Sequence, residues 1–261
     1  MKSIELFAGI GGIALAAEWA GIETVALCER DPFCQQVLNK HWPSVPIFDD
    51  ICTLNKQALE ERGVDVGTIE LISGGYPCQP FSVAGERKGE DDDRHLWPEV
   101  KRLLQEIQPT WFVGENVAGH ITLGLDTVLF DLESIGYTWQ PFIIPACAVN
   151  APHRRDRVFI VAYSDSKSRS LTIFNRDRKK GKSRNKKEKV RSSNRFFAEM
   201  GPKIDSDVRG WETELAKSRL VRSDDGIPYL VDRLRSLGNA VVPQQIYPIL
   251  KFIKQINDME T

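Results

Sequence analysis

The chain has 261 residues, of which 41% are hydrophobic and 27% are charged. This composition excludes a fibrous, collagen-like or wholly disordered protein, and the length suits one large α/β domain with or without a small appendage. The net charge of −1 conceals an uneven distribution, because residues 165–195 hold 13 Lys or Arg and only 3 Asp or Glu. A basic segment on a neutral or acidic body indicates a polyanionic partner.

The five cysteines are scattered along the chain and include no CxxC pair, so we expect neither a disulfide framework nor a bound metal. No apolar run approaches the roughly 18 residues that cross a bilayer. Glu5, Glu18 and Glu23 interrupt the apolar N-terminal stretch, which is therefore not typical of a signal peptide. We expect a cytoplasmic monomer that does not contact a membrane.

Short apolar runs alternate with amphipathic stretches over about the first 160 residues, a pattern typical of βα units around a largely parallel sheet. The expected strands are 3–7, 24–28, 69–73, 111–114, 137–145 and 157–163. The expected helices are 13–20, 31–40 with Asp31 as its N-cap, 96–107, 125–135 and 246–256. Apolar periodicity ends after Tyr163, which predicts a body formed by residues 1–163 and 235–261 and an inserted basic region at 164–234.

A glycine cluster lies between the first predicted strand and the first predicted helix. Gly9-x-Gly11-x-x-Ala14 fits the pattern of nucleotide-binding loops, in which glycines allow a tight turn and a close approach to the ligand. Glu29 ends the next predicted strand, where an acid can bind ribose hydroxyls. The pattern predicts a site for an adenosine-containing cofactor without distinguishing a nicotinamide cofactor from another.

Three further groups of reactive residues lie at the ends of predicted strands. Cys78 follows the third strand in a proline-rich loop, and a thiol mounted on a loop can act as a nucleophile. Glu115 follows the fourth strand, and Arg155 and Arg157 lie at the start of the last one. Because open α/β sheets bind ligands at the carboxyl ends of their strands, we expect these groups to share one cleft.

In this order and spacing, the motifs resemble the DNA cytosine-5 methyltransferase family, whose members use S-adenosylmethionine. The matching pieces cover nearly the whole chain except the basic segment: Phe7 to Gly12, Glu29, Asp50-Ile51, Pro77-Cys78-Gln79, Glu115-Asn116-Val117, Arg155-x-Arg157 and Gly238 to Pro243. Arg30 departs from the family, since relatives often carry an apolar or aromatic residue there. The resemblance implies a Rossmann-like α/β methyltransferase fold with a short target-recognition region at 164–234.

The resemblance also implies a role for each motif. Cys78 would attack C6 of a cytosine flipped out of double-stranded DNA, Glu115 would protonate ring N3, and Arg157, with Arg155 near it, would hold the base O2. The residues implied to bind the cofactor are Phe7, Gly9, Gly11, Glu29, Asp50, Ile51, Pro77, Asn239 and Ala240. The residues implied to contact DNA are Gln79, Ser82, Lys179, Lys180, Lys182 and Arg184. A cognate restriction endonuclease would be the functional partner.

Four alternatives explain less of the sequence. An RNA-directed member of the family, acting on tRNA, shares the chemistry, but its Cys-Phe-Thr signature is absent from the sequence. A nicotinamide oxidoreductase accounts for the glycine cluster and Glu29 but leaves Cys78 and Glu115 without a role. A cytidine deaminase needs a second cysteine three positions after Cys78, where Phe81 stands. A relative that only binds DNA is disfavoured, because all the expected reactive residues are present.

Overall fold

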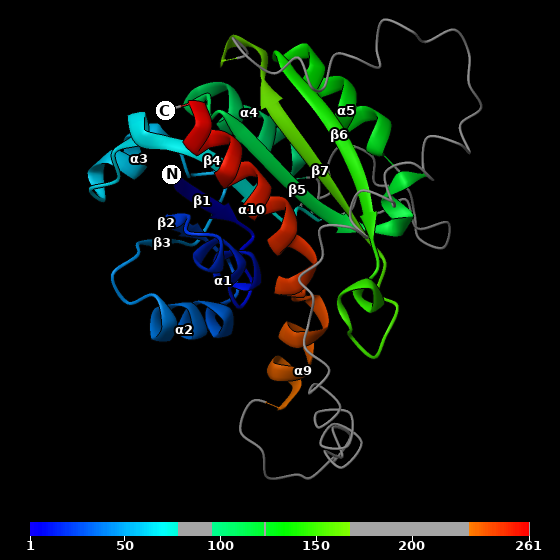
Figure 1. Cartoon of the computed structure of the whole chain (residues 1–261). Helices are drawn as coiled ribbons and strands as arrows, with labels where there is room; N and C mark the ends of the chain where they lie inside the picture. Colours follow the sequence, from blue (N-terminus) through cyan, green and yellow to red (C-terminus); the bar gives the residue numbers. More distant parts are fainter. Residues whose placement is uncertain (78–95, 123, 168–229, 261) are drawn as a thin grey trace, which may run out of the picture.

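The computed structural model describes residues 1–77, 96–122, 124–167 and 230–260. Seven strands form one sheet in the order β3-β2-β1-β4-β5-β7-β6 (Figure 1). Their bounds are β1 (Lys2–Leu6), β2 (Glu23–Cys28), β3 (Ile47–Phe48), β4 (Ile69–Gly74), β5 (Trp111–Val117), β6 (Tyr137–Ile144) and β7 (Arg157–Ser164). The first five strands are parallel, and β7 runs antiparallel to both β5 and β6. The predicted α/β class and largely parallel sheet are confirmed.

The longer helices also agree with the periodicity of the sequence. Their bounds are α1 (Gly12–Trp19), α2 (Pro32–His41), α3 (Lys56–Glu61), α4 (Trp97–Ile107), α5 (Leu125–Ser134), α9 (Leu230–Asn239) and α10 (Pro243–Glu260), with four short 3-10 turns, η1 (Val66–Thr68), η2 (Ala118–Ile121), η3 (Ala146–Val149) and η4 (Asp165–Lys167). Asp31 is the N-cap of α2, as predicted, and its side chain accepts hydrogen bonds from the amides of Phe33 and Cys34. The sequence analysis did not predict β3, α3 or α9.

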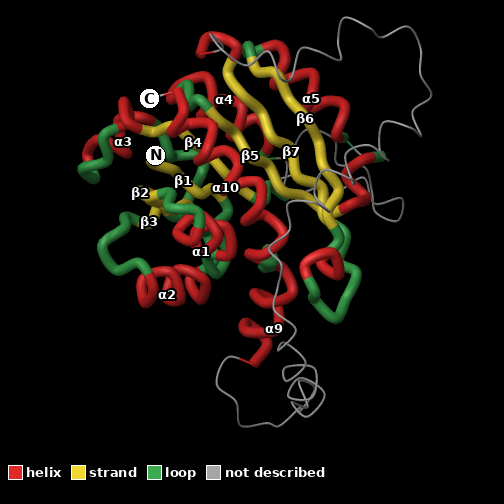
Figure 2. The backbone as a smooth tube through the Cα atoms, in the orientation of Figure 1, coloured by secondary structure: helices red, strands yellow, loops and turns green. Residues whose placement is uncertain are grey.

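Helices cover both faces of the sheet (Figure 2). Phe159 and Val161 of β7 belong to the apolar cluster with α1 and α10, whereas Val158 and Ile160 belong to the cluster with α4 and α5. Neighbouring residues of a strand point to opposite faces, so a strand buried on both sides reads as a continuous apolar run. The sheet is therefore the middle layer of three.

Helix α10 closes the face that also carries α1 (Figure 1). Ile246, Ile249, Leu250 and Ile253 are all buried, which confirms the helical spacing predicted for this segment. They pack in one cluster with Ile13 and other residues of α1, so the first helix and the last described helix share a core. In the part of the chain that the structure describes, no helix is long and apolar enough to cross a bilayer.

Candidate active site at the carboxyl edge of the sheet

The loops that follow four parallel strands meet at one edge of the sheet. Leu6 at the end of β1 lies beside both Cys28 and Gly74, and Gly74 lies beside Gly114 of β5. The segments that follow these residues are therefore neighbours. Because β7 runs antiparallel to β5, its first residue, Arg157, lies at this same edge.

The loop between β1 and α1 turns through residues with positive φ. The φ angles are 54° at Phe7, 55° at Gly9 and 84° at Gly11. A Cβ on Gly11 would overlap the ring of Trp42, and its positive φ also favours glycine, whereas no described atom lies within 4 Å of a Cβ built on Gly9. The loop therefore offers bare backbone and open space directly before the N-terminus of α1, as the close approach of a ligand requires.

Glu29, at the end of β2, is joined to this loop. Its two carboxylate oxygens accept hydrogen bonds from the amides of Gly9 at 2.7 Å and Asp31 at 2.8 Å. A carboxylate offers about four lone-pair positions. The side chain can therefore hold the loop and still accept hydrogen bonds from ribose hydroxyls.

The residues after β3 and β4 extend the same edge. Asp50 is exposed, and its Oδ1 accepts a hydrogen bond from the amide of Cys52 at 2.9 Å. Ile51 is only 4% exposed and belongs to the core cluster, so most of its side chain packs inside the protein. Pro77 is half-buried at the last described position after β4.

Beneath the glycine loop lies a buried acid that the sequence analysis did not select. Glu5 of β1 is 2% exposed. Burial raises the pKa of Glu5 to about 8, although hydrogen bonds from the backbone of Ala14 and Ile13 favour the carboxylate. Among the described residues, no group hydrogen-bonds to its Oε2. A buried carboxyl oxygen without a described partner at the start of α1 fits a ligand that brings a hydrogen-bonding group.

The second half of the site is an ion pair between the buried Glu115 and the largely buried Arg157. Glu115 of β5 and Arg157 of β7 lie on the same face of the sheet, and Arg157 Nε donates to Glu115 Oε1 at 2.7 Å. Burial raises the pKa of the Glu115 carboxyl, while the positive charges of Arg157 and Arg155 lower it. A Cβ on Gly75 would lie 2.9 Å from Glu115 Oε2. The acid therefore lies against the segment that follows β4.

Tyr76 joins that segment to β5, η2 and α4 by one contact each. Its carbonyl oxygen accepts a hydrogen bond from Asn116 Nδ2 at 3.0 Å, its hydroxyl lies 2.9 Å from His120 Nε2, and its ring packs against Trp97 with centroids 5.1 Å apart. Burial lowers the pKa of His120, which favours the neutral ring. Tyr76 comes two residues before Cys78 in the sequence, so these contacts fix the start of the loop that carries the predicted nucleophile.

The two arginines of the Arg155-x-Arg157 motif have different partners. Arg157 contacts Glu115, whereas Arg155 Nη2 donates to the carbonyl oxygens of Gly238 at 2.7 Å and Ala240 at 2.6 Å. The sequence analysis expected both arginines near the base. The structure brings Arg155 close enough to act electrostatically on Glu115, but its hydrogen bonds go to the C-terminal part of the chain.

The segment of residues 236–241 lies against the glycine loop and α2, as the predicted cofactor site requires. A Cβ on Gly12 would lie 2.6 Å from the carbonyl oxygen of Val241. Asn239 ends α9 with an exposed side chain, and the amide of Ala240 donates to Ser236 at 2.9 Å. Asn239 and Ala240 are therefore at the same edge of the sheet as the loops after β1 and β2.

Several predicted site residues lie outside the described part of the chain. These are Cys78, Gln79, Ser82, Lys179, Lys180, Lys182 and Arg184.

One prediction about the acid needs correction. Glu115, Asn116 and Val117 were expected directly after the strand, but β5 continues through Val117 and pairs there with β7. The pairing with β7 places Glu115 beside Arg157. The sequence analysis also missed Tyr76 and His120. Only Glu5 gave a visible signal, as a carboxyl between the apolar Ile4 and Leu6 of its strand.

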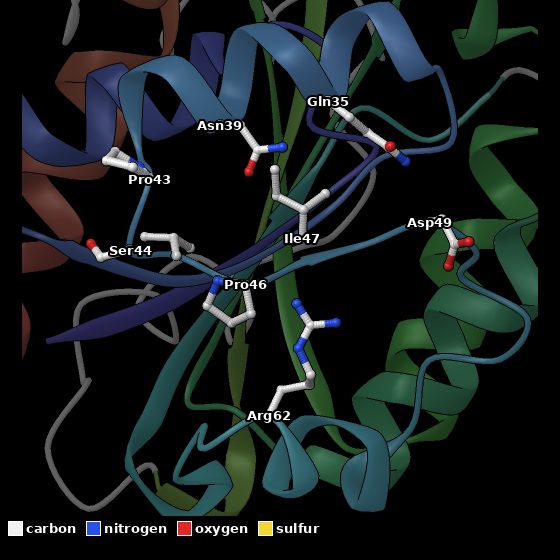
Figure 3. A pocket seen from close by; sticks show the side chains of 9 residues that line it. Gln35, Asn39, Pro43, Ser44, Pro46, Ile47, Asp49 and Arg62 are labelled. Atoms are coloured by element: carbon white, nitrogen blue, oxygen red, sulfur yellow. The ribbon is translucent and has the colours of Figure 1, made fainter.

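A separate cavity of about 560 Å³ opens at the outer edge of β3. Figure 3 shows the amides of Gln35 and Asn39 on one side, Arg62 on the other and Ile47 between them. None of the predicted site residues lines this cavity. The chemistry assigned to the strand ends therefore does not depend on it.

Comparison with known proteins agrees with this geometry. The fold is the Rossmann-like α/β fold of S-adenosylmethionine-dependent methyltransferases. The chain belongs to the C-5 cytosine-specific DNA methylase family, whose model matches residues 1–203. The resemblance inferred from the motifs is thereby confirmed.

Two curated relatives and one solved structure illustrate the relationship. Type II methyltransferase M2.BsuMI of Bacillus subtilis is 34% identical over 190 residues, which is 68% of this chain and 45% of that protein. Type II methyltransferase M.AquIA of Picosynechococcus is 35% identical over 175 residues, which is 61% of this chain and 71% of that one. The chain thus spans about half the length of the first relative. The S. pombe Dnmt2 methyltransferase shares the fold, with a TM-score of 0.65 and 16% identity over 99% of both chains.

Proposed function

We propose that this chain transfers a methyl group from S-adenosylmethionine to C5 of cytosine within a short site in double-stranded DNA. The observation that carries the proposal is the buried Glu115–Arg157 pair, which lies against Gly75, three residues before Cys78. An acid, a guanidinium group and the start of a thiol-bearing loop then adjoin a glycine loop suited to a nucleotide-like cofactor. Family membership supports the same assignment.

In the proposed reaction, catalysis begins at C6, because C5 of cytosine is a poor nucleophile. The Cys78 thiolate bonds to C6, N3 gains a proton, and the ring becomes an enamine with a nucleophilic C5. S-adenosylmethionine, when bound, supplies an electrophilic methyl group. After C5 has taken this methyl, a base removes the C5 proton, the Cys78–C6 bond breaks with its electron pair on sulfur, and N3 returns its proton to the acid that supplied it, which restores the aromatic ring. C6 is unreachable in stacked DNA, so the cytosine must be flipped out.

Glu115 is the proposed acid for N3. Its burial favours the protonated form that this step needs. Arg157 occupies Oε1 of the carboxyl, which leaves Oε2, the oxygen beside Gly75, for the base. A guanidinium group carries five N–H donors, and Arg157 uses Nε on Glu115 and Nη1 on the carbonyl oxygen of Asp156. Its other donors suit a carbonyl such as cytosine O2.

The residues at the strand ends fit the proposed cofactor. Phe7, Gly9 and Gly11 would border the methionine part, Glu29 would bind the ribose, and Asn239 and Ala240 would form the opposite wall. Three observations support this fit: the open space at Gly9, the two hydrogen bonds that orient Glu29, and the unused oxygen of Glu5. Asp50, Ile51 and Pro77 would complete the site at the adenine end.

The proposed function is tested by bisulfite sequencing of plasmid DNA from cells that express the chain. The wild type should protect cytosines in one short sequence, the Cys78→Ala variant none, and Glu115→Gln at least 100-fold fewer per unit time, the range for loss of a general acid. Unprotected DNA from cells with soluble wild-type protein would refute DNA methylation. Protection that persists in Cys78→Ala would refute the assigned nucleophile.

Sequencing bisulfite-treated small RNA from the same cells distinguishes the RNA alternative. We expect no new protected cytosine in tRNA. Methylated tRNA together with unprotected plasmid would assign the chain to RNA instead.

We further infer that the basic segment binds phosphates and that Gln79 and Ser82 contact DNA next to the flipped base. Replacing Lys179, Lys180, Lys182 and Arg184 by glutamine should weaken binding to all DNA sequences. The slope of log K against log salt should fall by about 0.9 for each phosphate that the variant no longer neutralises. An unchanged slope would leave the segment without this role.

Because both curated relatives are named Type II methyltransferases, we also propose a cognate restriction endonuclease as functional partner.

A further inference from the structure

The side chain of Arg155 hydrogen-bonds to the main chain of residues 238–240. A single nitrogen, Nη2, donates to the carbonyl oxygens of Gly238 and Ala240, which flank Asn239. Hydrogen bonds from a charged donor are stronger than those between neutral groups. Because both acceptors are main-chain atoms, the contact fixes the path of the segment whatever the side chain at position 239.

The backbone of Arg155 is itself held in place. Its φ is +35°, in the region that L-residues rarely adopt. Its carbonyl oxygen accepts a hydrogen bond from Gln245 Nε2 at 3.1 Å, and the same nitrogen donates to Ile144 at 2.7 Å. Gln245 is fully buried in α10. A strained backbone persists where its surroundings determine it, and the hydrogen bond from Gln245 is a contact by which helix α10 holds the main chain of Arg155.

The glycine loop contacts residues 238–241 from the other side. The carbonyl oxygen of Val241 lies so close to Gly12 that a Cβ there would be only 2.6 Å away. Ser236 Oγ, two residues before Gly238, lies 3.4 Å from Cys34 Sγ of α2. Residues 238–241 are therefore clamped between Arg155 and the loop proposed to bind the cofactor.

Arg155 and Arg157 contact different parts of the site. Arg157 hydrogen-bonds to Glu115, whereas the effect of Arg155 on that carboxyl comes through charge alone. We propose that Arg155 is a positioning residue that holds residues 238–241 against the glycine loop and so forms one wall of the S-adenosylmethionine site. This inference rests on the proposed function. It differs from a role for Arg155 on the base, because it predicts a defect in cofactor binding that needs no DNA.

The test compares Arg155→Met with Arg154→Met. Both changes remove one guanidinium group, but the Arg154 side chain is 84% exposed and pairs with its near neighbour Asp156. Titration calorimetry with S-adenosylmethionine, without DNA, should show Kd raised roughly 10- to 100-fold in Arg155→Met, as expected when hydrogen bonds to a charged donor are removed. Arg154→Met should bind within about twofold of wild type. Arg155→Lys, which keeps a charged donor, should recover part of the affinity.

Kinetics separates positioning from general damage. With saturating S-adenosylmethionine, Arg155→Met should keep kcat within about threefold of wild type while its KM for the cofactor rises in parallel with Kd. A variant that binds the cofactor normally but loses kcat would overturn the proposal and would favour a role for Arg155 in binding the cytosine base. A variant that loses kcat and thermal stability without a selective rise in KM would also overturn it.

Hydrogen exchange keeps the inference testable if the proposed function fails. If the wild-type protein binds no S-adenosylmethionine, the cofactor assignment is wrong, but the clamp still predicts faster amide exchange in a peptide covering residues 236–245. We expect the rate to rise at least tenfold in Arg155→Met and not in Arg154→Met. Equal exchange in the two variants would overturn the clamp. If Arg155→Met does not fold, Gly12→Ala, which presses on the segment from its other side, should raise both Kd and exchange.

Discussion

Replacing Glu5 by glutamine should stabilise the protein at neutral and higher pH while leaving it almost unchanged near pH 4. Glu5 is 2% exposed beneath the glycine loop, and burial raises its pKa from 4.5 to about 8. Between these two values, the folded protein holds a proton that the unfolded chain has released. Stability from this group is therefore fully present below pH 4.5 and is lost as the pH rises toward 8. Glutamine has nearly the shape of the protonated acid and does not ionise.

The magnitude follows from the two pKa values. Each unit of difference corresponds to about 1.4 kcal/mol. At pH 7 the wild type should therefore be about 3 kcal/mol less stable than at pH 4 on account of this one carboxyl. Since a domain is stabilised by about 5–15 kcal/mol in total, the effect is large enough to measure. At pH 8 and above, the gain in Glu5→Gln should reach its plateau.

The assay is urea denaturation of the wild type, Glu5→Gln and Glu18→Gln at pH 5, 6, 7 and 8. The comparison of free energies of unfolding at each pH cancels the titration of all other groups. Glu18→Gln removes an exposed carboxyl from α1 and serves as the matched control for the change of charge. A gap between wild type and Glu5→Gln that stays constant from pH 5 to pH 8 would refute the reasoning, because it would mean that Glu5 is ionised in the folded protein.

Three further changes test the packing around the site. Gly12→Ala places a methyl group against the carbonyl oxygen of Val241, so it should cost about 1–3 kcal/mol of stability; an unchanged melting temperature would contradict the close approach. Tyr76→Phe should lower the urea midpoint by the equivalent of about 1–3 kcal/mol, because it leaves the buried His120 without its hydroxyl partner. Adding His120→Leu to this variant should recover most of the loss, and no recovery would argue against the pair. Phe159→Ala, at a fully buried position of β7, should cost about 3–5 kcal/mol in urea denaturation, and a loss below 1 kcal/mol would argue against its burial.

Most long elements could be predicted from the sequence because their apolar residues repeat with the period of a helix or form short runs. Strand β3, with two residues, and α3, with six, are too short to show a period. The position of β7 between β5 and β6 also leaves no mark in the sequence, because strand order depends on pairing between distant segments. Glu115 and Arg157 are adjacent, as expected. Glu115 lies near the carboxyl end of a parallel strand, whereas Arg157 reaches the same edge because β7 runs antiparallel and begins there.

The clamp at Arg155 could not be predicted in the same way. Its acceptors are carbonyl oxygens, and that of Gly238 lies 83 residues away in sequence. Every residue has a main-chain carbonyl oxygen, so the amino-acid sequence does not show which residues accept these hydrogen bonds. Tyr76 and His120 are similar, since a tyrosine and a histidine 44 residues apart form a buried pair only once β4 and β5 are side by side.

The contact between Gly12 and Val241 also has a consequence for synthesis of the protein on the ribosome. The glycine loop and α1 are made before the segment that covers them, because Val241 follows Gly12 by 229 residues. At about 5–20 residues per second, the two are separated by roughly 10–50 s. During this interval the nascent chain exposes the apolar side of α1 that α10 later covers. The contact between Gly12 and Val241, and the packing of α10 on α1, form only after α10 has left the ribosome.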